Sequence, residues 1–383
     1  MEKNRKYFNR YVFLSTFARS LIELFIGTIL FKAGFDLKSV IFYYLFVNVF
    51  SFIIAFPCIY IAKKHSNKIL TILGIIAFIL VQVSLNYVHL SVWYLLLLSF
   101  LYASYRRAYW MSRRYYTLQV IDKKNTSKEY SFVSILNQLA LLLSSYVGSL
   151  LLEYININII TYISILLLLI GLYCVYKMDF EYEINKTKIN IFETIRVTPI
   201  SSIITIGCYE LQNVITFLLP LYIVIYVKNT YTAVGIINLL AQLATIIFLY
   251  AYGLLINKDK NYLKFSIVFL LVFKFLQVNT YGLVLFIITF ISGLATKMYE
   301  QSFNKELLIL SKHYEFHNFN LLYECTQNIF RIFTVGVCLL FIDDVKVMLY
   351  FTLVMISIPL LVKFKTLPKI KKSKVLWNEK TSK

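Results

Sequence analysis

The chain of 383 residues is 59% hydrophobic and only 15% charged, whereas soluble domains are about half apolar and about a quarter charged. This composition excludes an ordinary soluble protein and indicates a protein that crosses a membrane several times. The formal net charge of +20 could suggest nucleic-acid binding. The basic residues lie between hydrophobic runs, however, so no nucleic-acid partner is expected.

Twelve hydrophobic runs of spanning or near-spanning length follow one another along the chain. They cover residues 11–31, 40–61, 69–88, 92–112, 130–152, 158–176, 200–226, 234–256, 262–279, 281–303, 319–341 and 347–362. A transmembrane helix needs about twenty apolar residues, so the pattern predicts an all-α membrane protein of about twelve helices. The boundary between the ninth and tenth runs is the least distinct, since only Asn279 and Thr280 separate them.

The cysteines, histidines and loop charges set further expectations. The five cysteines lie in apolar runs without a CxxC pair, and the four histidines have no other potential metal ligands at zinc-site spacing. We therefore expect neither a metal nor a cofactor. No signal peptide is expected, because the first apolar run is too long. Lys and Arg concentrate in alternate loops, and such loops remain in the cytoplasm. We therefore expect a bacterial cytoplasmic membrane protein with both termini in the cytoplasm.

A long polar stretch near the middle predicts two pseudo-symmetric six-helix bundles. The expected units are a first bundle at 1–176, a central cytoplasmic loop at 177–199, a second bundle at 200–362 and a basic cytoplasmic tail at 363–383. An offset of about 195 residues brings similar features into register. The fourth helix of each bundle ends in charged residues, and the fifth begins with an amide pair: Asn137 and Gln138 in the first, Gln327 and Asn328 in the second.

The loop after the eighth run contains a basic turn, with Gly253, Asn257, Lys258 and Lys260 in GLLINKDKNY. The loop after the second run, in CIYIAKKHSNK, contains a less complete copy that lacks the Gly and an acidic residue. In these turns and in its six-plus-six layout the chain resembles the major facilitator superfamily. The resemblance implies that helices 1, 4, 7 and 10 line a central cavity, with alternating access by rocking of the two bundles. It also suggests a structural or coupling role for Gly253 and Lys258.

Ten charged residues fall inside the predicted spans, where a charge is costly and usually functional. Seven lie on the four helices that the resemblance assigns to the cavity, and these are the candidates for binding substrate or protons: Arg19, Glu23, Arg106, Arg107, Glu210, Lys297 and Glu300. The other three are Lys274, Glu324 and Arg331.

Spacing predicts some of their partners. Arg19 and Glu23 are four residues apart and can pair, either to hold an anionic group and set the proton affinity of Glu23 or as a structural ion pair. Lys297 and Glu300, three apart, can also pair. Adjacent helical residues point about 100° apart, so at most one of the neighbours Arg106 and Arg107 faces a cavity. Those two arginines either bind substrate or extend to the headgroups.

The remaining charges allow two interpretations each. Glu210 is either a proton carrier or a structural hydrogen-bonding group. Glu324 and Arg331, two turns apart, favour a buried tie between helices, and Lys274 favours a packing or snorkelling role. Arg113 and Arg114, at the end of the fourth run, are expected to be topological anchors.

Together these features predict a proton-coupled secondary active transporter, not an enzyme, that acts as a monomer. Its partners would be protons, membrane lipids and a small amphipathic or zwitterionic organic substrate, with export slightly favoured over uptake and Glu23, Glu210 or Glu300 as proton carrier. ATP drive is not expected, because the chain has no GxxxxGK[ST] motif. Two alternatives stay open: a lipid or lipid-linked glycan flippase, and a membrane enzyme of polysaccharide assembly, against which the short outer loops count.

Overall fold

A computed structural model describes residues 2–120, 126–178, 191–255, 262–311, 314, 316–341 and 344–362. Within these ranges the regular structure is entirely helical. The helices are α1 Glu2–Ser20, η1 Glu23–Phe25, α2 Ile26–Lys32, α3 Leu37–Lys64, α4 Asn67–Asn86, α5 Val92–Val120, α6 Thr126–Tyr154, α7 Ile157–Lys177, α8 Ile191–Val197, α9 Ile200–Tyr209, α10 Gln212–Tyr222, η2 Ile223–Val227, α11 Tyr231–Leu255, α12 Leu263–Asn279, α13 Gly282–Ser311, α14 Phe316–Cys338, η3 Leu339–Phe341 and α15 Val345–Leu361.

The predicted all-α architecture of about twelve spans is confirmed. Nine segments of the described chain are long and apolar enough to cross a membrane. The helices α5, α12 and α15 complete the twelve: α5 carries several arginines, and the other two have 17 residues each. The indistinct boundary between the ninth and tenth runs is a tight turn, in which Gly282 adopts φ +65°. That left-handed conformation suits glycine, which has no Cβ to clash.

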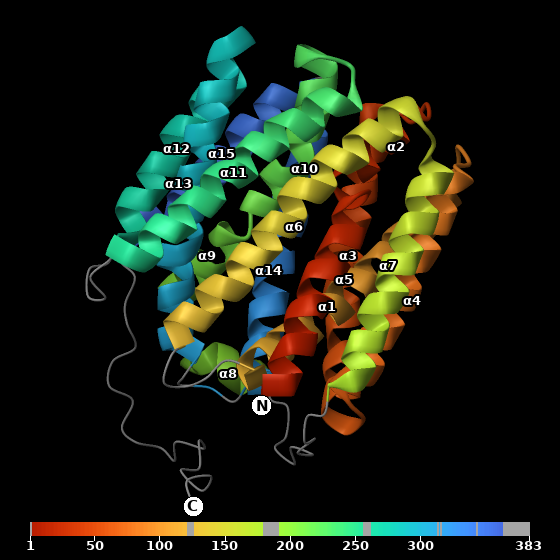
Figure 1. Ribbon diagram of the computed structural model, residues 1–383. Helices are drawn as coiled ribbons and strands as arrows, with labels where there is room; N and C mark the ends of the chain where they lie inside the picture. The colour runs from red at the N-terminus through yellow and green to blue at the C-terminus, as the bar shows by residue number, and fades with distance from the viewer. Residues whose placement is uncertain are drawn as a thin grey trace, which may run out of the picture.

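The spans form an upright bundle (Figure 1), in which α8 and the start of α1 lie at the same end. We call this the α8 end. We call the segments α1–α7 and α8–α15 the N-terminal and C-terminal halves; the residue boundaries of the two bundles stay a prediction. The halves meet where α6 packs against α11 and where α3 packs against α14. The short helix α8 lies within the predicted central loop.

Small residues let the packed helices approach closely. A Cβ added to Gly148 of α6 would lie 2.3 Å from the backbone oxygen of Leu21, and one added to Gly235 of α11 would lie 2.1 Å from the Ser149 hydroxyl of α6. In lipid, where hydrocarbon gives no drive for helices to associate, such close backbone contact is a main source of packing energy. Gly148 therefore fixes the distance between α6 and the first span, and Gly235 fixes the crossing between the two halves.

The first span of each half is interrupted near mid-depth. In the N-terminal half α1 ends at Ser20 and the chain resumes in η1, with the Ile22 amide bonded to the Arg19 carbonyl at 3.2 Å. In the C-terminal half α9 ends at Tyr209 and α10 begins at Gln212. Interrupted spans leave backbone groups without their helical partners, so such breaks occur where protein or a cavity supplies substitutes. Both breaks lie beside a carboxylate that the sequence analysis selected, Glu23 and Glu210.

The halves also touch at the end opposite α8. The Lys32 ammonium donates to the Asn229 carbonyl at 3.3 Å. The ring of Tyr44 on α3 stacks on Phe217 of α10, with centroids 3.8 Å apart. The Glu153 carboxylate accepts from the first amide of α11 at 2.6 Å, where an acidic group also complements the helix dipole. These contacts close the bundle above the interrupted spans.

We expect Gly148→Ala to destabilise the protein, because its methyl group would have to displace a backbone oxygen rather than a flexible side chain. Overpacking of this kind costs about 1–3 kcal/mol. The matched control is Gly336→Ala on α14, where an added Cβ meets nothing within 4 Å. Thermal unfolding of the purified variants in detergent should show a lower Tm for Gly148→Ala alone. Equal melting of the two variants would contradict the close approach of α6 to the first span.

Candidate functional site

The pair predicted on the first span forms and is held by α5. Arg19 and Glu23 lie 3.1 Å apart, and the Tyr102 hydroxyl of α5 donates to the other Glu23 oxygen at 2.6 Å. The Arg19 guanidinium lies 5.0 Å from the ring centre of Tyr109 and 5.3 Å from that of Trp110, which adds a cation–π attraction. Arg19 is buried, whereas the Glu23 side chain keeps a fifth of its surface exposed.

Glu210 lies at the break of the seventh span, where three side chains donate to its carboxylate. Arg331 and Tyr323, both on α14, contact its two oxygens. Asn213, one turn along, donates at 2.5 Å. The Glu210 backbone carbonyl accepts from the Asn213 amide at 3.1 Å and from Arg331 Nε at 3.4 Å. Arg331 and Asn213 thus hydrogen-bond both to the Glu210 carboxylate and to its backbone carbonyl, as buried polar groups require.

Glu324 joins the two halves. Its side chain is completely buried, and it forms ion pairs with Arg107 and Arg114 of α5. Arg114 also donates to the Asn320 side chain at 3.0 Å. The predicted tie between helices therefore exists, but it runs from Glu324 to α5, while Arg331 pairs with Glu210. We call the set Arg107, Arg114, Asn320 and Glu324 the α5–α14 clamp.

Arg106 differs from its neighbour. Arg107 is buried in the clamp, whereas Arg106 is half-buried. In the described part of the chain no carboxylate pairs with Arg106 and no side chain hydrogen-bonds to it. Its charge acts on Tyr43 and Tyr102 on one side and on Glu210 and Arg331 on the other. The Arg106 charge therefore acts on groups around both carboxylate centres. No described side chain binds its donors, so of the adjacent pair Arg106 is the one available to a ligand.

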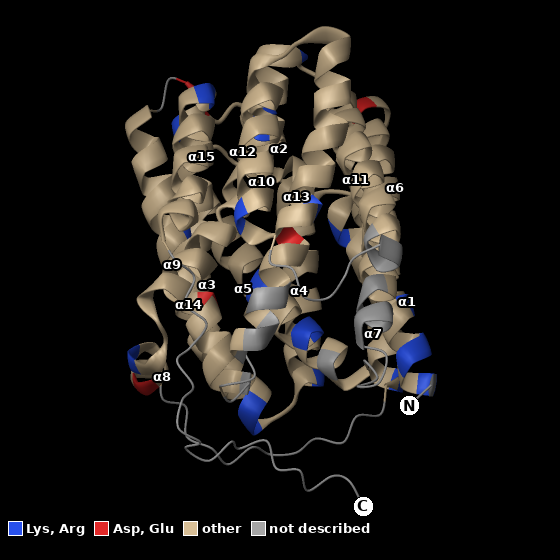
Figure 2. Ribbon diagram, turned by 90° about the vertical axis from the view of Figure 1, so that its left-hand side faces the viewer, with Lys and Arg blue, Asp and Glu red and all other residues tan. Residues whose placement is uncertain are grey.

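The fourth span of the C-terminal half carries the second predicted pair. Lys297 and Glu300 of α13 lie 2.7 Å apart, with the lysine buried and the carboxylate 30% exposed. Gly253 lies in the last turn of α11, and Lys258 lies outside the described residues. Figure 2 shows charged ribbon at mid-height as well as at the ends of the bundle, which agrees with these internal pairs.

Two arginines lie elsewhere than expected. Arg113 and Arg114 were expected to be surface anchors, but Arg113 is buried and donates to the Tyr109 hydroxyl at 2.7 Å. Arg114 is 29% exposed and belongs to the clamp. The interpretation as anchors is wrong for these side chains, because α5 continues to Val120 and keeps both arginines within the packed helices.

Sequence reasoning did not find the hydroxyl partners Tyr102, Tyr109 and Tyr323. One signal was present: Tyr102, Arg106, Tyr109 and Arg113 recur every three or four residues, so they share one face of α5. Asn320 and Glu324, four residues apart, also share a helix face, and this was a weaker signal that they bind the same partner. Of the residues described, no group of three or more His, Cys, Asp or Glu could hold a metal ion.

A family model described as "Major Facilitator Superfamily" matches residues 11–304. The chain belongs to the Major Facilitator Superfamily. Several solved transporters share its fold. A bacterial homologue of the iron transporter ferroportin, in an inward-facing state, superposes with a TM-score of 0.70 at 9% identity, covering 94% of this chain and 98% of that one. The search of curated proteins found no match.

Two further superfamily structures agree. One from a study of proton-dependent oligopeptide transporters has a TM-score of 0.69 at 10% identity and covers 94% of this chain and 95% of that one. A mutant of the nucleoside transporter NupG gives 0.64 at 14%, with 94% and 100% coverage. At such identities the likeness shows the fold alone. The family identifies a multi-pass membrane transporter and confirms the resemblance drawn from the basic turns and the layout.

We expect Glu324→Gln to destabilise the protein strongly, because it leaves two arginines of the clamp without their counter-charge. Removing one partner of a buried ion pair typically costs about 3–5 kcal/mol. Glu300→Gln, at a partly exposed pair, should cost about 1 kcal/mol or less. The double variant Arg107→Leu with Glu324→Leu should recover part of the stability, since it removes the two buried charges and leaves only the partly exposed Arg114 without Glu324. Unfolding in detergent measures all three, and an unchanged Tm for Glu324→Gln would contradict the clamp.

Proposed function

We propose that the chain is a proton-coupled secondary active transporter that moves a small amphipathic or zwitterionic organic molecule across the bacterial cytoplasmic membrane by alternating access. The observation that carries the proposal is Arg106, a half-buried cation without an ion-pair partner among the described residues, between carboxylates of both halves. An uncompensated cation at membrane depth is unfavourable. A bound anionic group would stabilise it, so we assign Arg106 to the substrate.

Glu23 is the proton carrier that the geometry favours. Glu210 accepts from an arginine, a tyrosine and an asparagine, all of which stabilise its ionised form. Glu23 accepts from one arginine and one tyrosine, without a third donor side chain among the described residues, and a fifth of its side chain is exposed, so a proton can reach it with the loss of fewer hydrogen bonds. Glu300, also partly exposed, is paired with a lysine three residues before it on the same helix, and that pair does not join α13 to another element.

The clamp gives alternating access a structural basis. Glu324 and Arg107 belong to different halves, and they lie on the α8 side of mid-depth, about 12 Å along α14 from Phe316. Opening at the α8 end must separate them. The many basic residues near the α8 end support a cytoplasmic location for it. In this proposal the clamp is closed when the cavity opens outward and parts when it opens to the cytoplasm.

We expect Arg106→Ala to weaken substrate binding about tenfold or more, because hydrogen bonds to a charged group contribute about 1.5–3 kcal/mol. A ligand is first sought by thermal shift of the purified protein across amino acids, peptides, sugars and drugs, and its affinity is then titrated in each variant. The control is Lys38→Ala, an exposed lysine at the other end of the bundle. Equal affinity of Arg106→Ala and the parent for every ligand would contradict the assignment.

We expect Glu23→Gln to abolish uphill transport driven by a pH gradient while preserving exchange of labelled for unlabelled substrate, since exchange needs no net proton movement. Proteoliposomes with an imposed gradient measure both, and the sign of the gradient that drives accumulation reports the direction. Fluorescent lipid in the same vesicles tests scrambling. Accumulation that persists after a protonophore collapses the gradient would exclude proton coupling, and loss of exchange in Glu23→Gln would assign Glu23 to substrate instead.

A further inference from the structure

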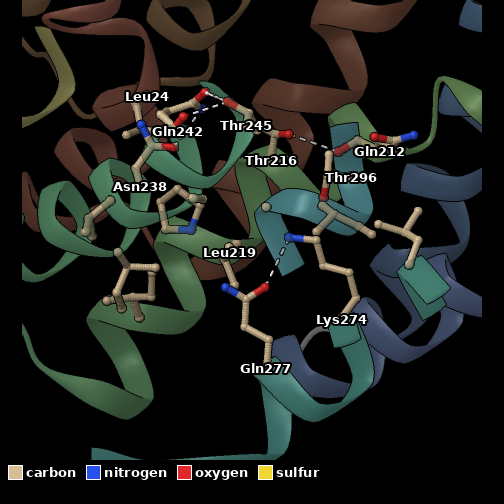
Figure 3. A pocket seen from close by; sticks show the side chains of 18 residues that line it. Leu24, Gln212, Thr216, Leu219, Asn238, Gln242, Thr245, Lys274, Gln277 and Thr296 are labelled. Carbon is tan, nitrogen blue, oxygen red and sulfur yellow. Dashed lines mark hydrogen bonds between the residues drawn. The ribbon is translucent and has the colours of Figure 1, made fainter. Parts of the chain in front are cut away.

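A second polar site lies inside the C-terminal half. It is a cavity of about 130 Å³ between α10, α11, α12 and α13, with Leu24 of η1 at its edge. Amide and hydroxyl groups from all four helices line it. Those labelled in Figure 3 are Gln212, Thr216, Asn238, Gln242, Thr245, Gln277 and Thr296. The charged residue among its lining groups is Lys274.

Lys274 is directed into this cavity by the register of α12. The buried positions of α12 include Ser266, Ile267, Leu270 and Gln277, so Lys274 lies on the same inward stripe, about 16 Å along the helix from Leu263. The residues that face outward, such as Phe275, are exposed. Of the two roles expected for Lys274, packing fits this position and snorkelling does not, since a side chain on the inward stripe extends between helices rather than toward the headgroups.

The Lys274 ammonium is held by a fixed amide. It donates to Gln277 Oε1 at 3.0 Å, as Figure 3 shows. Gln277 is itself oriented by α13, because its Nε2 donates to Thr289 at 3.0 Å and its Oε1 also accepts from Ser292 at 3.2 Å. An ammonium has three donors, and a single bond to a neutral oxygen does not balance its charge. Throughout the described ranges no carboxylate lies within ion-pair distance of Lys274, in contrast to Lys297 and its Glu300.

We propose that this cavity binds a small carboxylate, with Lys274 as the counter-cation and the surrounding amides and hydroxyls as further hydrogen-bond donors. A half-buried cation between helices is stabilised by a partner, and the cavity offers donors such as Gln212, whose Nε2 is buried and has no partner in the described chain. The cavity is smaller than an apolar cavity of about 150 Å³ that holds benzene, so its size suits a carboxylate smaller than benzene, such as propionate. The site is separate from Arg106, so it stands independently of the transport proposal.

Propionate and its neutral isostere propionamide are the probes, titrated calorimetrically against the full-length protein in detergent. We expect propionate to bind and propionamide to bind about tenfold or more weakly, since only the carboxylate makes a charge-assisted bond. Lys274→Met should lose this preference, Lys274→Arg should keep it, and Arg106→Ala should leave it unchanged. Lys274→Met should fold, because it removes a half-buried charge that has no carboxylate partner among the described residues.

A variant that leaves the charge in place tests the cavity itself. Thr216→Trp places an indole on the cavity wall from a position that is otherwise exposed, and it should abolish propionate binding with Lys274 intact. The proposal is overturned if propionate and propionamide bind equally or not at all, or if binding survives in both Lys274→Met and Thr216→Trp. Loss of binding in Arg106→Ala alone would overturn it by placing the anion in the central site.

Discussion

The ion pairs of Glu324 with Arg107 and Arg114 are the constraint on which the arrangement of the two halves depends. Three charged groups from helices about 210 residues apart in sequence meet here. Arg107 and Glu324 are buried and Arg114 is 29% exposed, and an unpaired buried charge costs several kcal/mol. The alternative arrangements of α5 and α14 leave at least one of these charges without a partner. Leu321 and Cys325 of α14 also make apolar contact with α3 and α5. Apolar contact alone, however, would not prevent α14 from sliding along α5. The ion pairs specify the register.

The two interrupted spans share one arrangement, in which a carboxylate lies beside the break in the helix. In a continuous helix the backbone N–H and C=O groups are already hydrogen-bonded to one another, so only side chains are available to bind another group. At each break a carboxylate lies beside freed backbone groups, and the neighbouring helix supplies an arginine or tyrosine. In the N-terminal half Glu23 uses Arg19 of its own span and Tyr102 of α5. In the C-terminal half Glu210 takes both its arginine and its tyrosine from α14. The two sites match in position but differ in bonding, since Glu210 has a third donor in Asn213 and Glu23 keeps a fifth of its side chain exposed.

Hydropathy was sufficient to predict the spans because each one must be apolar over a membrane thickness, a property local to a stretch of about twenty residues. The pairs Arg19–Glu23 and Lys297–Glu300 could be predicted for a similar reason, since helix geometry brings residues three or four apart together. The partner of Glu324 could not, because the register of α5 against α14 depends on packing between distant segments. The polar surroundings of Lys274 could not be predicted for the same reason: its neighbours in sequence are hydrophobic, and most of the polar groups around it come from other helices.

The clamp explains how a strong contact can also be a temporary one. Its stability rests on the absence of water, which makes each charge depend on the others. In the proposed transport cycle, separation of α5 and α14 at the α8 end would let water solvate Glu324 and Arg107 individually, so much of the lost attraction would be recovered as hydration. A partly separated clamp has neither the ion pairs nor full hydration, and it is less favourable than either end state. Two stable arrangements with an unfavourable intermediate are what a transporter that opens to one side at a time requires.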